Sequence, residues 1–272
     1  MELDEVAVDP LQSVDDMKTW MLGVLLLTGW CWIDVRSARA EATPLRIAAA
    51  ASLRDVVGEI VLAYERQHAV VVQPTFNASG QIVAMIRAGA PVDVFLSAGT
   101  REVDALVTDG LVDPDSRTVF AGNVLVLVVS IDAKAPPTSF DDLKKPAFGK
   151  VAMGQPKTVP AGLYAQQVLD HLKLTSALEG RVVYASHVRQ VLDHVARGEV
   201  GAGLVYRTDA AALKEQVKIV ATAEKTWHEP IEYTGVRLKD SKQAEEGKRF
   251  LTFLKGVQAR GAFVARGFEV GE

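Results

Sequence analysis

The sequence predicts an α/β fold of two lobes, each with a mixed, mostly parallel β-sheet flanked by helices. From Leu45 onward, short apolar runs alternate with amphipathic stretches, which is typical of βα units. One apolar run, residues 119–131, is too long for an ordinary parallel strand. We therefore expect it to leave one sheet and enter a second, with a return crossover at residues 231–238, after the turn signal Glu229-Pro230. One continuous sheet is the alternative that this pattern leaves open.

The individual elements follow from the same pattern. The apolar runs that we expect as strands span residues 45–50, 70–76, 92–96, 124–131, 150–153, 182–184, 202–206 and 217–220. The amphipathic stretches that we expect as helices span residues 53–67, 81–88, 161–172, 188–197 and 242–253. Two crossover strands assign residues 43–122 and 233–272 to one lobe and residues 123–232 to the other. A chain of 272 residues is long enough to bury a core in each lobe.

The first 42 residues have the pattern of a secretory signal peptide. An apolar segment, residues 20–33, is too short for a comfortable membrane span and is followed by Ala38-Arg39-Ala40. Cleavage after Ala40 or after Ala42 fits equally well. Residues 1–16 are an acidic extension, and a start at Met17 would give a conventional short signal. A membrane anchor and a buried helix are the alternatives. The single cysteine, Cys31, lies inside this segment.

The composition argues against several classes of function. A formal net charge of −4 provides no basic surface for nucleic acid. The five histidines lack the spacing of a compact metal site, and the chain has neither a phosphate-binding P-loop nor a G-x-S-x-G nucleophile motif. Gly201-Ala202-Gly203 supplies only part of a dinucleotide-binding fingerprint. We therefore expect no catalytic residue, no bound cofactor and no nucleic-acid partner.

Helix starts that follow strands are the most informative feature of the chain. Ser52 comes directly after the first expected strand, and Asp55 three residues later completes a capping-box pattern. Ser79 has the same context after the second strand. Each serine could cap its helix, bind a ligand oxygen, or do both. The N-terminus of a helix presents unpaired N–H groups and partial positive charge, which suits an anion.

Two further helix starts and one tyrosine extend this set. Pro160 suits the first helical position, which leaves the backbone N–H of Ala161 free for an anion. Ser186 is expected to cap the next helix, with the N–H of Val188 pointing outward. Tyr206 ends an apolar strand, where its phenol could reach a cleft or sit satisfied in the core. Neutral donors at several helix starts indicate an oxyanion-binding protein.

Seven segments in this order resemble the periplasmic molybdate-binding proteins of ABC-type importers, over residues 45 to about 270. They are AAASL (49–53), FNASG (76–80), GAPVDVFLSA (89–98), GNVLVLVV (122–129), VPAGLYA (159–165), HVRQVL (187–192) and GLVY (203–206). The resemblance implies a type II periplasmic-binding-protein fold with the ligand held between two lobes. It also implies a ligand set of two serines, two backbone amides and one tyrosine. By motif these are Ser52, Ser79, the amides of Ala161 and Val188, and the hydroxyl of Tyr206.

The function implied is capture of molybdate, and of tungstate, in the periplasm and delivery to a membrane permease. Molybdenum would reach the protein only as the oxyanion, and we expect a monomer. A fully ionised oxyanion accepts hydrogen bonds only, so its pocket needs only donors. The implied ligand set has no carboxylate to accept the remaining proton of phosphate, which argues against phosphate. The size of the cavity would separate molybdate from sulfate. A sulfate or thiosulfate receptor with a smaller pocket is one alternative. An enzyme on the same fold, with Ser52 as nucleophile, is another, and it would need a base beside Ser52.

Overall fold

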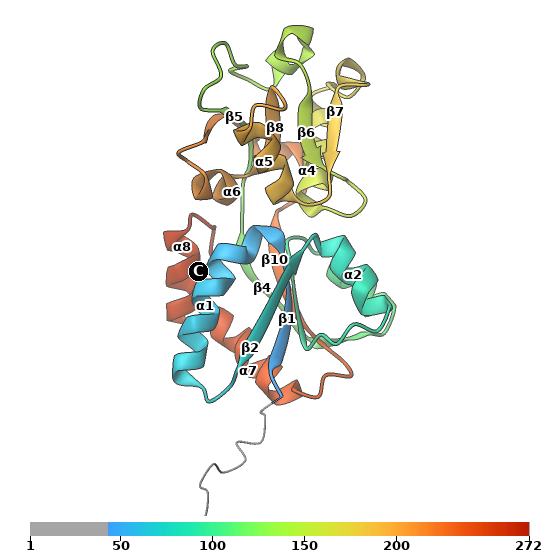
Figure 1. Ribbon diagram of the computed structural model, residues 1–272. Coiled ribbons are helices and arrows are strands. Elements are labelled where there is room, and N and C mark those ends of the chain that lie inside the picture. The colour runs from blue at the N-terminus through green and yellow to red at the C-terminus, as the bar shows by residue number, and fades with distance from the viewer. Residues whose placement is uncertain (1–42, 272) are drawn as a thin grey trace, which may run out of the picture. The chain divides into compact units, whose positions relative to one another are not determined.

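The structure is a computed structural model that describes residues 43–271, and this part of the chain forms one compact unit with two lobes (Figure 1). The expected signal segment, its two cleavage sites and Cys31 lie outside the described residues. Among the described helices, none combines the length and the apolar character that crossing a membrane requires.

The first sheet has the strand order β2-β1-β3-β10-β4. Its strands are β1 (Leu45–Ala50), β2 (Val72–Asn77), β3 (Val94–Ser97), β4 (Val112–Gly122) and β10 (Glu232–Leu238). Strand β1 pairs in parallel with β2 and β3, whereas β10 runs antiparallel to β3 and β4. The sheet is therefore mixed, and β10 enters it from a part of the chain far from the other four strands.

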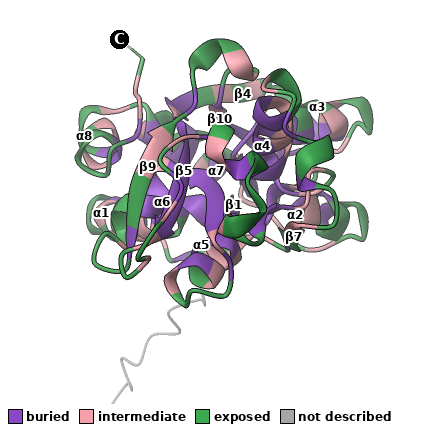
Figure 2. Cartoon of the chain, turned by 90° about the horizontal axis from the view of Figure 1, so that it is seen from above, coloured by how far each residue is buried: buried purple, intermediate pink, exposed green. Residues whose placement is uncertain are grey.

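Helices cover both faces of this first sheet. They are α1 (Arg54–Gln67), α2 (Ser79–Arg87), α3 (Arg101–Thr108), α7 (Ala244–Leu254) and α8 (Val257–Ala265). Because successive side chains of a strand point to opposite faces, Phe95 packs with the cluster of α2 and α3. Its neighbours Val94 and Leu96 pack with the cluster of α1, α7 and α8. Figure 2 shows the buried strands at the centre and exposed surface on the outer helices.

The second sheet has the strand order β7-β6-β8-β5-β9. Its strands are β5 (Leu125–Ser130), β6 (Val151–Gly154), β7 (Val182–Ala185), β8 (Ala202–Tyr206) and β9 (Val217–Thr222), and its helices are α4 (Pro160–His171), α5 (Val188–Ala196) and α6 (Arg207–Ala212). Strand β6 is parallel to β7 and β8, and β5 is antiparallel to β8 and β9. A Cβ on Gly162 would lie 2.1 Å from the Gly154 carbonyl oxygen, so glycine lets α4 start directly against the end of β6.

The chain passes between the sheets twice, at two crossover segments that we define as residues 122–124 and 230–232. The long apolar run expected at 119–131 does change sheets, but as two strands, with β4 ending at Gly122 and β5 beginning at Leu125. The return run is strand β10. Near the C-terminus, Glu269 forms an antiparallel bridge with Gly122. The predicted fold class, two mixed sheets flanked by helices in two lobes, is confirmed, and the single continuous sheet is wrong.

The sequence pattern missed α3, α6, α8 and most of β4. Strand β4 contains Pro114 and many polar residues, which is possible because β4 lies at the edge of its sheet and shifts register beside Gly235. Helices α3 and α6 are only 8 and 6 residues long, too short for a periodic pattern to stand out.

Candidate functional site

All five predicted site residues line one small cavity between the lobes. Ser52, Ser79, Ala161, Val188 and Tyr206 line a cavity of about 10 Å³, enough for about one water-sized sphere. Ser52 and Ser79 come from the first lobe, and the other three come from the second. Elements that begin with free N–H groups converge here from both lobes. The sequence-based argument therefore selected residues that the fold brings together.

Ser52 lies in a short 3₁₀ turn, Ala51–Leu53, that precedes α1. Its side chain makes no capping hydrogen bond, so the capping box with Asp55 is wrong. Instead the Ser52 Oγ accepts a hydrogen bond from the Tyr233 hydroxyl at 3.0 Å. The residue is 3% exposed, and its own hydroxyl proton has no acceptor among the described residues. This proton is available to a ligand in the cavity.

Ser79 is the first residue of α2 and also makes no capping bond, since Ala78 occupies the cap position. The Ser79 Oγ accepts a hydrogen bond from the backbone N–H of Ala98 at 3.1 Å. Ser79 therefore resembles Ser52 in one respect that matters for binding an anion. Its oxygen is already occupied as an acceptor, so its hydroxyl is left to donate.

The second lobe contributes two helix N-termini. Pro160 is the first residue of α4, as predicted, and Ala161 follows it in the first turn. Val188 is the first residue of α5. The first N–H groups of a helix have no carbonyl partner within the helix, so both amides can donate to a ligand.

The cap of α5 differs from the prediction, because His187 and not Ser186 occupies that position. The His187 Nδ1 accepts a hydrogen bond from the Gln190 N–H at 3.1 Å, whereas Ser186 binds the Gln190 side chain. Burial lowers the pKa of His187, with further lowering by the positive charges of Arg54 and Arg189. The imidazole is therefore neutral near pH 7. His187 lines the cavity, and only its position just before a helix start could have indicated this.

Tyr206 ends β8 and is 1% exposed. Its hydroxyl donates to the Ala98 carbonyl oxygen of the other lobe at 3.2 Å. Burial raises the pKa of Tyr206 well above its ordinary value, so the phenol keeps its proton. Because a hydroxyl has a single proton, Tyr206 must leave Ala98 in order to donate to a ligand.

Three other contacts join the lobes around the cavity. The Gly80 N–H donates to the Thr158 carbonyl oxygen at 2.9 Å. The Arg101 guanidinium donates to the carbonyl oxygen of Lys157 at 3.1 Å. The third contact is an ion pair between Arg189 and Asp55, with 2.6 Å between Nη2 and Oδ2.

Arg189 also binds within its own lobe. Its Nε lies 2.6 Å from the Oδ1 of Asp209, a fully buried carboxylate at the start of α6. The guanidinium next to Val188 thus joins an acid in each lobe. Among the side chains that line the cavity, His187 is the only ionisable group apart from the tyrosine. The cavity therefore offers neutral donors, while the nearby full charges are paired with one another.

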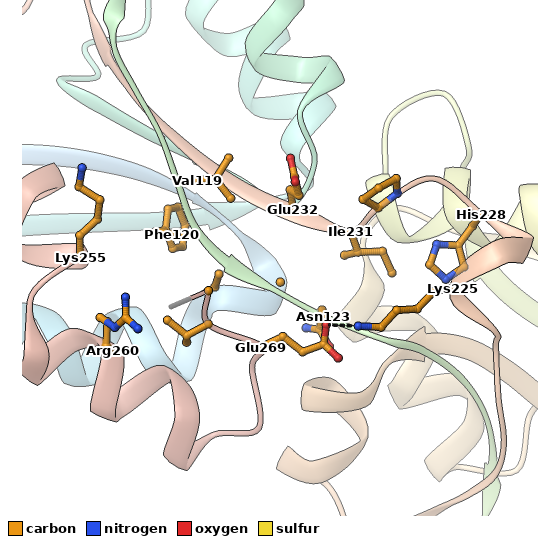
Figure 3. A pocket seen from close by; sticks show the side chains of 15 residues that line it. Val119, Phe120, Asn123, Lys225, His228, Ile231, Glu232, Lys255, Arg260 and Glu269 are labelled. Atoms are coloured by element: carbon orange, nitrogen blue, oxygen red, sulfur yellow. Dashed lines mark hydrogen bonds and ion pairs between the residues drawn. The ribbon is translucent and has the colours of Figure 1, made fainter.

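A second, larger cavity lies at the crossover segments and contains none of the five predicted residues (Figure 3). Its lining carries charges of both signs, including Lys225, Arg260, Glu232 and Glu269. Figure 3 shows Lys225 directed toward Glu269, to which it is bound at 2.9 Å. Within residues 43–271, no three His, Cys, Asp or Glu side chains gather closely enough to hold a metal ion.

Sequence comparison places the chain among bacterial transport proteins. The family model for bacterial extracellular solute-binding proteins matches residues 45–269. The putative ABC transporter substrate-binding lipoprotein YvgL of Bacillus subtilis is 37% identical over 91% of this chain and 95% of YvgL. The molybdate-binding protein ModA of Escherichia coli is 33% identical over 86% of this chain and 92% of that protein.

Structural comparison agrees with the sequence. The periplasmic molybdate-binding protein of Azotobacter vinelandii superposes with a TM-score of 0.74 at 26% identity, over 84% of this chain and 100% of that chain. The sulfate-binding protein SubI of Mycobacterium tuberculosis superposes with a TM-score of 0.75 at 19% identity, over 85% and 88%, a likeness of fold alone. Since the family model spans nearly all of the described residues, the chain belongs to the bacterial extracellular solute-binding proteins.

Proposed function

We propose that this protein captures molybdate, and tungstate as well, and delivers it to the membrane permease of an ABC importer. The observation that carries the proposal is the cavity between the lobes, whose polar lining consists of neutral hydrogen-bond donors from both lobes. The relatives named as molybdate-binding proteins support the choice of oxyanion. They also confirm the resemblance that we drew from the sequence motifs.

The proposed ligand set is the hydroxyls of Ser52, Ser79 and Tyr206 and the backbone amides of Ala161 and Val188. A fully ionised oxyanion offers acceptors only, so each of these groups would donate one hydrogen bond to it. The helix N-termini add a favourable dipole without a counter-ion. The oxygens of the anion would satisfy these donors, so the molybdenum would touch no side chain, and we propose no further cofactor.

The preference for molybdate over sulfate would come from the larger size of the molybdate anion. Metal–oxygen bonds are longer than sulfur–oxygen bonds. Donors fixed on two lobes cannot all move inward to stay within hydrogen-bond distance of a smaller ion. Each hydrogen bond to a charged group that is lost costs about 1.5–3 kcal/mol. The likeness to SubI concerns the fold and gives no reason to prefer sulfate.

A hydrolytic role for Ser52 fits the geometry poorly. The neighbour of its Oγ is the Tyr233 hydroxyl, which donates to it and whose pKa is raised by burial, so the protonated phenol is no general base. The Nδ1 of His187, the imidazole that lines the cavity, is occupied by the Gln190 N–H. We propose that the protein works as a monomeric receptor outside the cytoplasm, after a signal peptide within residues 1–42 has been removed.

Three substitutions test the proposed site by calorimetric titration with molybdate. Ser52→Ala, Ser79→Ala and Tyr206→Phe each remove one donor to a charged ligand, so each should weaken binding about 10- to 100-fold. Ser116→Ala is a matched control, because Ser116 lies in β4 and bonds to Asp113 and Arg237 away from the cavity. Unchanged affinity in all three site variants would remove the proposed ligand set.

A further inference from the structure

A chain of hydrogen bonds connects the crossover segment 122–124, through Tyr233 of β10, to Ser52. The backbone N–H of Val124 donates to the Asn123 Oδ1 at 2.9 Å. The Asn123 Nδ2 donates to the Tyr233 hydroxyl oxygen at 3.2 Å and to the Thr208 Oγ1 at 2.8 Å. The Tyr233 hydroxyl then donates to the Ser52 Oγ at 3.0 Å. We call Asn123, Tyr233 and Ser52 the crossover relay.

The backbone N–H of Val124 fixes the orientation of Asn123, the member of the crossover relay farthest from the cavity. A backbone N–H can only donate, so the Asn123 oxygen must face Val124 and the Asn123 NH₂ group must face the other way. That NH₂ group occupies the oxygen of Tyr233 as an acceptor. The buried Tyr233 proton needs an acceptor, and among the described residues that acceptor is the Ser52 Oγ. The Ser52 proton, which has no acceptor there, is left to point into the cavity.

Packing holds the Tyr233 ring in this position. Tyr233 is fully buried, and its ring meets Phe268 edge-on with 5.3 Å between centroids. Phe120 and Tyr206 pack against the same ring at 6.2 and 5.8 Å. Burial raises the pKa of Tyr233 well above its ordinary value, with a further increase from the charge of Asp209. The phenol therefore remains a donor across the physiological pH range.

We propose that Tyr233 is a positioning residue for the oxyanion site, which it serves by holding Ser52 in the donor state. Tyr233 itself contributes no hydrogen bond to the ligand. Its effect on binding passes entirely through Ser52, because without it the Ser52 hydroxyl can rotate and its oxygen becomes free to accept. A ligand that can only accept hydrogen bonds then has to pay for ordering that hydroxyl. The proposal rests on the proposed function in that Ser52 is taken to contact the oxyanion.

A double-mutant cycle in the purified protein tests this role. The variants are Tyr233→Phe, Ser52→Ala and the two together, and the measurement is molybdate affinity by calorimetry at constant pH and salt. Tyr64→Phe is the matched control, since Tyr64 is another fully buried tyrosine of the first lobe whose hydroxyl donates to Glu246. We expect Tyr233→Phe to weaken binding about tenfold and Tyr64→Phe to leave it unchanged.

The double variant should bind molybdate as Ser52→Ala does, because Tyr233 has nothing to act on once the serine hydroxyl is gone. Additive losses would show that Tyr233 acts independently of Ser52 and would overturn the proposal. Wild-type affinity in Tyr233→Phe would overturn it as well. If the wild-type protein binds no oxyanion, the proposed function fails first, and the role of Tyr233 fails with it.

Asn123→Asp probes the opposite end of the crossover relay and serves if Tyr233→Phe does not fold. A carboxylate at this position accepts from Val124 and also from Tyr233, which withdraws the Tyr233 proton from Ser52. We expect Asn123→Asp to weaken molybdate binding at least tenfold, as much as Tyr233→Phe or more. The loss should shrink about tenfold, to the part due to the added negative charge, when Asn123→Asp is combined with Ser52→Ala and compared with Ser52→Ala alone. A loss as large in that background as in the wild type would contradict the relay.

Discussion

The ion pair between Arg189 and Asp55 joins the two lobes beside the ligand cavity, and its removal should weaken molybdate binding. Asp55 belongs to α1 of the first lobe, and Arg189 follows Val188 in the first turn of α5. Separation of the lobes would break this pair, whereas the pair of Arg189 with Asp209 lies within one lobe. Asp55→Asn therefore removes a contact that only the closed arrangement makes.

The magnitude follows from the exposure of the pair. The two side chains are 19% and 36% exposed, intermediate between a surface ion pair and a buried one. Surface pairs contribute about 0.2–1 kcal/mol, and hydrogen bonds to charged groups contribute about 1.5–3 kcal/mol. We take about 1.4 kcal/mol, which corresponds to about tenfold weaker binding. Because the lobes must part to release a ligand held between them, the loss should appear mainly in the dissociation rate.

Electrostatics alone predicts the opposite sign for Asp55→Asn. Removal of a negative charge near a dianion should tighten binding if the carboxylate has no role in closure. Stopped-flow dissociation and calorimetry with molybdate distinguish the two cases. Asp109→Asn is the control, because its pair with Arg87 at 2.7 Å lies within the first lobe. Equal or tighter binding in Asp55→Asn would refute the closure argument. It would also be refuted if the substitution lowered the free energy of unfolding of the unliganded protein by as much as it lowered the free energy of molybdate binding.

Two further predictions concern closure and pH. A Cβ on Gly80 would lie 2.7 Å from the Thr158 backbone of the other lobe. Gly80→Ala should therefore weaken molybdate binding at least about tenfold and leave the melting temperature of the unliganded protein unchanged. Wild-type affinity in calorimetry would contradict this. Burial raises the pKa of Asp209 to about 6, although Arg189 lowers it. The folded state therefore holds a proton that the unfolded chain has released, and the free energy of unfolding should fall as pH rises from about 4 to about 6. Asp209→Asn should remove this contribution, and urea unfolding of both unliganded proteins across that range measures it; identical slopes would contradict the assignment.

The sequence predicted the architecture well because apolar periodicity reports which segments are buried. The strands of both sheets and the helices that start at the cavity stand out as short apolar runs and amphipathic stretches. The edge strand β4 did not, because only three of its eleven residues are buried and it contains Pro114. Short helices such as α3 carry too few turns to show a period.

The five proposed ligand residues could be selected from sequence because each lies where a strand meets a helix or ends. What they do there could not be predicted as well. Ser52 and Ser79 have the pattern of caps, yet tertiary partners occupy their oxygens in place of the helix N–H groups. Tyr233 and Asn123 are 110 residues apart in sequence, and no local pattern relates them. Long-range hydrogen bonds of this kind depend on the folded sheets and are invisible in a single sequence.

The central claim is tested most directly by calorimetric titration of the protein beginning at Thr43 with molybdate, tungstate and sulfate in chelator-treated buffer. We predict tight one-to-one binding of molybdate and tungstate and no heat from sulfate. Binding of sulfate alone would retain the donors and the fold and overturn the proposed ligand. No heat of binding with any of the three anions would contradict the account of the cavity as an oxyanion site.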